Sequence, residues 1–330
     1  MAYKVSGTEL IKDDKTVIFR NINATVRRDA ISFSVQGSTS GYTSGGRNQG
    51  ETNVNVIDKF PFSTNTNATD VGDLTVERYA IAGQSSLYNG YTSGGYSDPL
   101  STSFNVIDKF PFSVDGNATD VGDLTSARNS LSGQSSETNG YSSGSTGNII
   151  DKFPFSSDAN ATDVGDLSQD RFSFAGQSST SSGYSSGGRT PLFVNTIDKF
   201  PFSSDANATD VGDLTGNRSQ GAGQSSDANG YISGGVPPYD GLNIIEKFPF
   251  SSDTNSTDVG DLTQFRWGSA GQSSTASGYT SGGRADLTVP PYSSILGTID
   301  KFPFSVDANA TGVGNLIGSS WRSRGTGQQV

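Results

Sequence analysis

Residues 150–167 read IDKFPFSSDANATDVGDL, and this segment recurs in closely similar form along a chain of 330 residues. Each copy begins with an isoleucine, and the six positions are Ile57, Ile107, Ile150, Ile197, Ile245 and Ile299. Successive copies are 50, 43, 47, 48 and 54 residues apart. A period of this size is typical of architectures in which each repeat is one supersecondary unit. The repeat is therefore the main evidence for the fold.

A second element, Gly-Tyr-x-Ser-Gly-Gly, recurs with the same number of copies, centred on Tyr42, Tyr91, Tyr141, Tyr184, Tyr231 and Tyr279. The second glycine position of this element always lies 38 residues after the preceding isoleucine, although Ser145 replaces the glycine in one copy. The next isoleucine follows after 11, 12, 5, 9, 10 or 16 residues. All length variation therefore falls in one loop per repeat.

Four short segments alternate with turn residues in each copy: GQSS, GYxSGG, IDKFPF and TDVGDLT. Segments rich in Tyr, Ile, Phe, Val and Thr between Gly, Asn, Asp and Ser clusters indicate short antiparallel strands. No window has a helical period. Four strands in about 47 residues, repeated, are typical of a propeller blade. The sequence predicts an all-β fold, a six-bladed β-propeller with four antiparallel strands per blade.

An arginine follows the TDVGDLT segment in five copies, at Arg78, Arg128, Arg171, Arg218 and Arg266. The order Arg, small strand, Tyr-x-x-Gly-Gly, variable loop, aromatic strand and Leu-containing strand resembles the kelch repeat of β-propellers over residues 40–330. The resemblance implies kelch-like blades. Phe-Pro-Phe stands where that repeat usually ends a strand with tryptophan, and the two tryptophans of the chain are Trp267 and Trp321.

The two ends of the chain receive different predictions: closure of the ring for the C-terminal residues and an arm for the N-terminal residues. Residues 322–328, RSRGTGQ, align with residues 218–224, RSQGAGQ, so the chain ends on another copy of the first strand. An open ring would leave sheet edges unpaired. We therefore predict that residues 322–330 close the first blade beside residues 40–75; the alternative is that residues 31–35 supply this strand. The propeller would then span residues 36–330, and residues 1–35 would form an N-terminal arm for attachment or oligomerisation.

Composition excludes several functional classes. The chain has no cysteine and no histidine, which removes thiol nucleophiles, Ser-His-Asp triads and the usual zinc, copper and haem ligands. Twenty-two basic against 33 acidic residues give a net charge of −11, which repels a phosphate backbone. No signal-peptide pattern and no membrane-length apolar run is present. We expect no catalytic residues, no cofactor, no nucleic-acid partner and no membrane insertion.

The quoted segment also resembles a calcium loop, because four oxygen-bearing side chains fall close together: Asp158, Asn160, Asp163 and Asp166. Calcium prefers six to eight oxygens, and an EF-type loop ends in a bidentate Glu that is absent here. Asn65, Gly312 and Asn315 replace acidic residues in other copies. We interpret the segment as a turn whose Asp and Asn side chains bond their own backbone, and keep calcium as the alternative.

Other repeated residues receive structural interpretations. The tyrosines and phenylalanine pairs are expected to pack between blades. The repeated arginine is expected to donate to loop carbonyls or to nearby Asp carboxylates. Lys152 beside Asp151 is interpreted as a solvated ion pair of small energetic value. The Asn-Ala-Thr tripeptides match a glycosylation acceptor but are interpreted as turn residues.

The variable loops remain as the source of specificity, since each joins the second strand to the third and all should share one face. Their side chains include types common on recognition surfaces, namely Arg47, Tyr96, Phe104, Arg189, Phe193, Tyr239, Arg284 and Tyr292. An alternative is that these loops vary without a binding role.

The N-terminal AYKVSGTELIKDD resembles the N-termini of structural and tail-associated proteins of marine bacteriophages, and the repeats resemble uncharacterised proteins of such phages. The resemblance implies a virion component, made in the host cytoplasm, that binds other virion proteins through its N-terminal arm. We expect a non-enzymatic tail fibre or adhesin whose loops recognise a host-surface glycan or protein. A decoration or bracing protein is the alternative, a glycan-cleaving enzyme is a more remote one, and homo-oligomerisation is left open.

Overall fold

The computed structural model describes residues 4–5, 8–9, 36–48, 50–145, 147–237, 241–286, 293–317 and 326–329. The chain divides into two units, Met1–Phe33 and Ser34–Val330. In the first unit, β1 (Lys4–Val5) pairs with β2 (Thr8–Glu9). The described part of the chain contains no helix long and apolar enough to cross a membrane.

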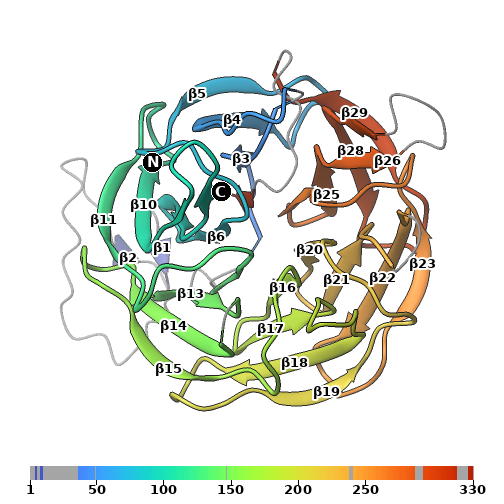
Figure 1. Cartoon of the computed structure of the whole chain (residues 1–330). Coiled ribbons are helices and arrows are strands. Elements are labelled where there is room, and N and C mark those ends of the chain that lie inside the picture. Colours follow the sequence, from blue (N-terminus) through green and yellow to red (C-terminus); the bar gives the residue numbers. More distant parts are fainter. Residues whose placement is uncertain are drawn as a thin grey trace. The chain divides into compact units, whose positions relative to one another are not determined.

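The second unit is a six-bladed β-propeller, as predicted: six four-stranded antiparallel sheets are arranged in a ring (Figure 1). The innermost strands are β30 (Thr326–Gln329), β6 (Ala82–Ser85), β12 (Ser132–Ser135), β16 (Ala175–Ser178), β20 (Ala222–Ser225) and β24 (Ala270–Ser273). The second strands are β3 (Ser40–Ser44), β7 (Asn89–Ser93), β13 (Asn139–Ser143), β17 (Ser182–Ser186), β21 (Asn229–Ser233) and β25 (Ser277–Ser281). Blades 1 to 6 are numbered in this order.

The third strands carry the KFPF element and are β4 (Val56–Pro61), β10 (Val106–Pro111), β14 (Ile149–Pro154), β18 (Thr196–Pro201), β22 (Ile244–Pro249) and β28 (Thr298–Pro303). The outermost strands are β5 (Thr69–Asp73), β11 (Thr119–Asp123), β15 (Thr162–Asp166), β19 (Thr209–Asp213), β23 (Thr257–Asp261) and β29 (Thr311–Asn315). Two variable loops contain small hairpins, β8 (Tyr96–Ser97) with β9 (Thr102–Ser103) and β26 (Arg284–Asp286) with β27 (Ser293–Ile295).

The outermost strand of each blade contains a bulge. In blade 3, Ile150 pairs with Gly165 whereas Asp151 pairs with Asp163, so the intervening Val164 is the extra residue. Gly165 also allows close approach of the next blade, because a Cβ atom there would lie 2.6 Å from the carbonyl oxygen of Ala206. The repeated Val-Gly pair therefore shapes both the strand and its contact with the neighbouring blade.

Closure of the ring through the C-terminus is confirmed. Strand β30 pairs antiparallel with β3, from Gly41 opposite Gln329 to Ser44 opposite Thr326. The first blade is therefore built from the two ends of the propeller sequence, which joins blade 6 to blade 1 by continuous chain. The unpaired edge that β3 would otherwise present is covered.

Aromatic packing between blades forms most of the core, as expected. The ring of Tyr141 in blade 3 stacks on Phe202 of blade 4 with centroids 4.8 Å apart and also contacts Phe200 at 5.4 Å. Phe60 and Tyr279 repeat this contact between blades 1 and 6, with centroids 5.5 Å apart. Equivalent contacts occur at every blade boundary, so each blade buries its aromatic face against the next.

Candidate recognition face

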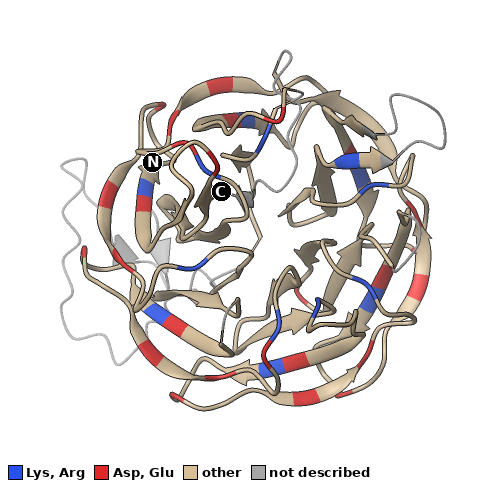
Figure 2. Ribbon diagram, viewed as in Figure 1, with Lys and Arg blue, Asp and Glu red and all other residues tan. Residues whose placement is uncertain are grey.

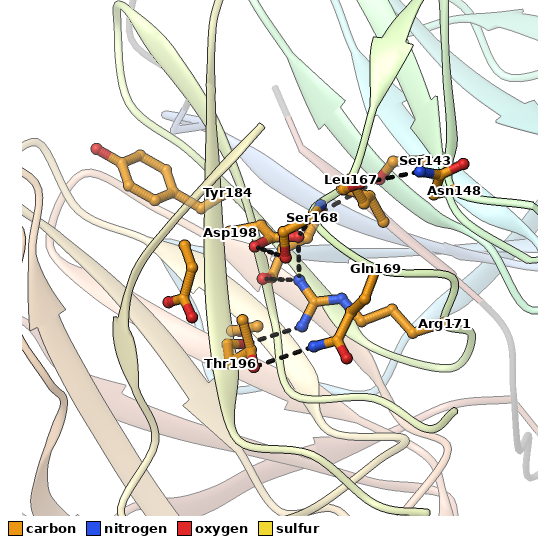
Figure 3. Close-up of polar contacts among 12 residues, drawn as sticks. Ser143, Asn148, Leu167, Ser168, Gln169, Arg171, Tyr184, Thr196 and Asp198 are labelled. Atoms are coloured by element: carbon orange, nitrogen blue, oxygen red, sulfur yellow. Dashed lines mark hydrogen bonds and ion pairs between the residues drawn. The ribbon is translucent and has the colours of Figure 1, made fainter. Parts of the chain in front are cut away.

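The repeated arginine clamps the base of the variable loop within its blade. Arg171 is fully buried, and its Nη1 atom donates to the carbonyl oxygens of Gly187 and Thr196, each at 2.9 Å (Figure 3). Gly187 begins the loop between β17 and β18, and Thr196 is the first residue of β18 after it. Arg128 and Arg266 bridge the two ends of their own loops in the same way. The clamp closes the loop base whatever the length of the loop above it.

A buried carboxylate holds each arginine in position. Asp198 Oδ2 lies 3.0 Å from Arg171 Nη2, and the same carboxylate accepts hydrogen bonds from the backbone and hydroxyl of Ser168 at 3.0 and 2.6 Å (Figure 3). Because Ser168 follows the last strand of blade 3, the carboxylate also connects consecutive blades. Burial lowers the pKa of Arg171, and the charge of Asp198 opposes that shift. Equivalent pairs form at Arg78, Arg128, Arg218 and Arg266.

This arrangement corrects the interpretation of Asp151 and Lys152 as a solvated pair. Asp151 is fully buried and pairs with Arg128, with 2.5 Å between its Oδ2 atom and Nη2. Lys152 points to the other face of the strand and pairs with the exposed Asp205 of the next blade. Adjacent residues of a strand face opposite sides, so the repeated Asp-Lys dipeptide contributes to two different contacts.

The acidic turn proposed as a calcium alternative makes contacts between blades. Asn160 Oδ1 accepts the backbone N–H of Asp123 in the preceding blade at 3.1 Å, and Asp158 pairs with Lys109. Asp163 bonds locally, within strand β15, where its Oδ1 atom accepts the N–H of Gly165 at 3.1 Å. The backbone N–H of Asp166 donates the equivalent hydrogen bond to Asn207 Oδ1 of the next blade, at 3.1 Å.

The prediction that these asparagines bond their own backbone was therefore wrong for the Asn-Ala-Thr positions. The same contact between blades recurs around the ring at Asn67, Asn117, Asn160, Asn207, Asn255 and Asn309. Acidic residues recur along the outermost strands (Figure 2). Within the described ranges, no group of three or more Asp or Glu residues is placed to hold a metal ion.

The described residues around the centre of the ring include no charged side chains. Cavities of about 140 and 80 Å³ lie along the axis, and their described lining consists of Gly, Ser, Gln, Ala and a few apolar residues without a charged group. Serine hydroxyls of several innermost strands bond the neighbouring strand; that of Ser178, for example, accepts the N–H of Ser135 at 3.0 Å. Gln134 Nε2 likewise donates to the carbonyl oxygen of Tyr184 at 3.0 Å.

The variable loops share one face of the propeller, which we call the loop face. On one side of it, ion pairs join the loops of blades 6, 1 and 2. Arg284 Nη1 lies 2.8 Å from Glu51 Oε1, Arg47 Nη1 lies 3.4 Å from Glu51 Oε2, and Arg47 also pairs with Asp98. The guanidinium groups of Arg47 and Arg284 further lie over Tyr79 and Trp267. Two of the three arginines predicted for recognition are thus engaged with neighbouring loops.

The other predicted recognition residues divide into three groups. Tyr96 packs its ring edge-on against Tyr79 at 5.9 Å, and Phe104 is half-buried at the base of its loop. Arg189 is exposed, forms no ion pair among the residues described, and has its guanidinium 5.1 Å from the centroid of Phe193. Tyr239 and Tyr292 lie outside the described residues.

A cleft opens on the loop face above blade 3, where the variable loop is shortest. Ile150 lies five positions after Ser145, whereas the corresponding step is 12 positions in blade 2 and nine in blade 4. The cleft has a volume of about 580 Å³, within the roughly 300–1,000 Å³ of small-molecule sites. Its lining from blades 2, 3 and 4 includes Ser103, Asn129, Ser145, Asp170, Phe172 and Arg189. We call it the blade-3 cleft.

Of this lining, Arg189 alone was among the recognition residues predicted from the sequence. Phe172 directly follows the clamping Arg171, outside the variable loops, and was not among the predicted recognition residues. It is nevertheless 39% exposed. The sequence did contain one indication of the cleft, because Ser145, which lines it, replaces a glycine that the other copies keep.

The sequence matches no protein-family model and no curated protein. The blades themselves identify the fold: the chain contains a six-bladed β-propeller of antiparallel four-stranded blades, consistent with kelch-like repeats.

Proposed function

We propose that the chain is a non-enzymatic recognition component of a phage particle, which presents the loop face to a glycan or protein on the host surface. The observation that carries this proposal is the blade-3 cleft. Five of the six blades are nearly identical in their fixed part, yet the loop lengths differ, and an open cleft forms above the shortest loop. Binding residues concentrate on loops held by a rigid scaffold, and the arginine clamps provide such support.

A binding role is favoured over catalysis by the placement of the charged groups. The repeated arginines and their carboxylates are buried in structural pairs, and the charged groups of the blade-3 cleft are one carboxylate, Asp170, and the guanidinium of Arg189 beside the buried Arg128. Glycoside hydrolysis would ordinarily need a pair of carboxyl groups about 5–10 Å apart. Assignment to a phage particle is supported by the resemblance of the N-terminal residues to phage structural proteins.

The test uses the phage that encodes the chain and its bacterial host. Purified protein added to host cells should compete with the particles and slow their adsorption. The double variant Phe172→Ala/Arg189→Gln should lose this competition, whereas Phe265→Ala should retain it. Phe265 is a matched control, because it is 37% exposed against 39% for Phe172 and does not line the cleft.

A decoration or bracing role predicts a different result. Particles that carry the double variant would then adsorb normally, and particles without the protein would disintegrate at a lower temperature. That combination would overturn the recognition proposal. Breakdown of host polysaccharide by the purified protein would overturn its non-enzymatic part.

A further inference from the structure

An exposed aromatic ring forms one wall of the blade-3 cleft. Phe172 is fixed by two backbone hydrogen bonds with Arg189, at 3.0 Å from its N–H and 2.9 Å to its carbonyl oxygen. The ring is therefore held on a rigid segment although 39% of the residue is exposed. A ligand with both an apolar ring face and hydroxyl groups could pack on such a side chain while its edges reach polar groups.

Polar groups on the floor of the cleft are already ordered. Asn129 Nδ2 donates to Ser103 Oγ at 2.9 Å, and Ser130 Oγ donates to Asn129 Oδ1 at 2.9 Å. After these bonds, Asn129 retains one amide hydrogen and Ser103 retains its hydroxyl hydrogen. Donors that are oriented before a ligand arrives lose little entropy on binding. Asn129 and Ser103 are therefore suited to bind hydroxyl groups of a ligand.

Ser145 is strained and has a free hydroxyl. Its φ angle is +84°, while the equivalent positions of the other blades are Gly46, Gly95, Gly188, Gly235 and Gly283 with φ between 103° and 113°. A non-glycine residue in this region costs stability, and such residues concentrate at binding sites. The Ser145 hydroxyl has no hydrogen-bond partner in the described part of the chain, although the residue lines the cleft. A contact with a ligand would account for the retention of serine here.

The charge and shape of the cleft narrow the ligand class. Asp170 and Arg189 contribute opposite charges, and the charge of Arg128 is balanced by Asp151. A neutral ligand is therefore favoured, especially on a chain of net charge −11. An extended peptide would need a long open strand edge, whereas Asn129 and Ser130 lie between strands and Ser103 ends the two-residue strand β9.

We propose that the blade-3 cleft binds a neutral oligosaccharide, with Phe172 against a sugar ring and Asn129, Ser145, Asp170 and Arg189 at its hydroxyl groups. The proposal rests on the proposed function in one respect, since it specifies the host glycan that the loop face would recognise. Binding itself is a property of the isolated chain and can be tested without the phage.

Calorimetric titration of the full chain with maltotriose, chitotriose, mannotriose and galactotriose tests the ligand class, with trigalacturonate as the acidic counterpart. At least one neutral trisaccharide should bind, and trigalacturonate should not. Phe172→Ala should weaken binding more than tenfold, and Phe265→Ala should leave it unchanged. No binding of any neutral trisaccharide, or equal weakening by both variants, would overturn the proposal.

Ser145→Gly gives a sharper test because two effects of opposite sign are expected. Glycine relieves the strain, so the melting temperature should rise, while loss of one hydrogen bond should weaken trisaccharide binding about fivefold. A purely structural serine would change stability without changing affinity. If no trisaccharide binds but the protein still competes with the phage, the ligand class is wrong and the recognition function stands. Trisaccharide binding without competition for host cells would support the cleft and contradict the recognition function.

Discussion

At the residue scale, the buried arginine and its carboxylate explain how blades tolerate loops of different length. Arg171 bonds to both ends of its loop, and Asp198 fixes the guanidinium while also bonding Ser168. The lengths of the loops can therefore diverge without disturbing the strands below them. The sequence predicted that the arginine bonds loop carbonyls or nearby Asp carboxylates, and Arg171 makes both contacts.

Loss of this clamp should be costly. Arg171→Met leaves the carboxylate of Asp198 buried without its charge partner, so the free energy of unfolding should fall by about 3–5 kcal/mol. The double variant Arg171→Met/Asp198→Asn should be less destabilised than the single one, because a neutral amide is cheaper to bury. Urea denaturation monitored by circular dichroism measures both.

The exposed ion pair provides the matched control. Lys152→Met removes the partner of Asp205, whose side chain is 59% exposed, and should change the free energy of unfolding by about 0–1 kcal/mol. Equal losses for Arg171→Met and Lys152→Met would contradict the distinction between the two pairs. A double variant as unstable as Arg171→Met would show that the uncompensated charge is not the cause.

At the element scale, close contact between the second and third strands depends on a glycine. Gly183 of β17 lies opposite Phe200 of β18, and a Cβ atom at Gly183 would lie 2.3 Å from the Phe200 Cζ atom. The ring thus covers the strand at this point, and the same arrangement recurs at Gly41, Gly90, Gly140, Gly230 and Gly278. The Gly-Tyr pair therefore combines a close approach with an aromatic contact to the next blade.

Gly183→Ala should force Phe200 from its position and lower the free energy of unfolding by about 1–3 kcal/mol. Gly216→Ala is the control, because no atom lies within 4 Å of a Cβ at that position and its φ is not in the left-handed region. Its unfolding free energy should stay within about 0.5 kcal/mol of the wild type. Similar denaturant midpoints for the two variants would contradict the proposed clash.

At the scale of the whole molecule, the boundary between blades 6 and 1 differs from the others. It keeps the aromatic contact of Phe60 with Tyr279 and the hydrogen bond from Gln272 Nε2 to the carbonyl oxygen of Tyr42, at 2.9 Å. The exposed Lys–Asp pair of the other boundaries is missing there, because Asn65 stands in place of the acid. Strand β30 also joins the C-terminal end of the chain to β3 of blade 1 by backbone pairing, a contact that no other blade boundary has.

Deletion of residues 322–330 should therefore destabilise the ring. The edge of β3 would lose its partner, and the melting temperature should fall by roughly 10 °C or more, given about 2–4 °C per kcal/mol for a large domain. Calorimetry measures the shift, and gel filtration should reveal association through the exposed edge. An unchanged melting temperature would contradict the role of β30 in closure.

The sequence by itself determined the repeat, the number of blades, the strand order and the return of the C-terminus to the first blade. These features follow from local patterns that recur six times, so each copy supports the interpretation of the others. The packing of the tyrosines and phenylalanines between blades followed in the same way, because aromatic side chains in a glycine-rich chain supply the buried area.

Only the tertiary structure decided which polar groups meet. Asn160 bonds a residue 37 positions away, and Arg284 pairs with Glu51 across 233 positions, so no local pattern could indicate either partner. The blade-3 cleft depends on a short loop between two longer ones from neighbouring blades. Its shape is a property of the closed ring, which brings side chains of three separate repeats around one space.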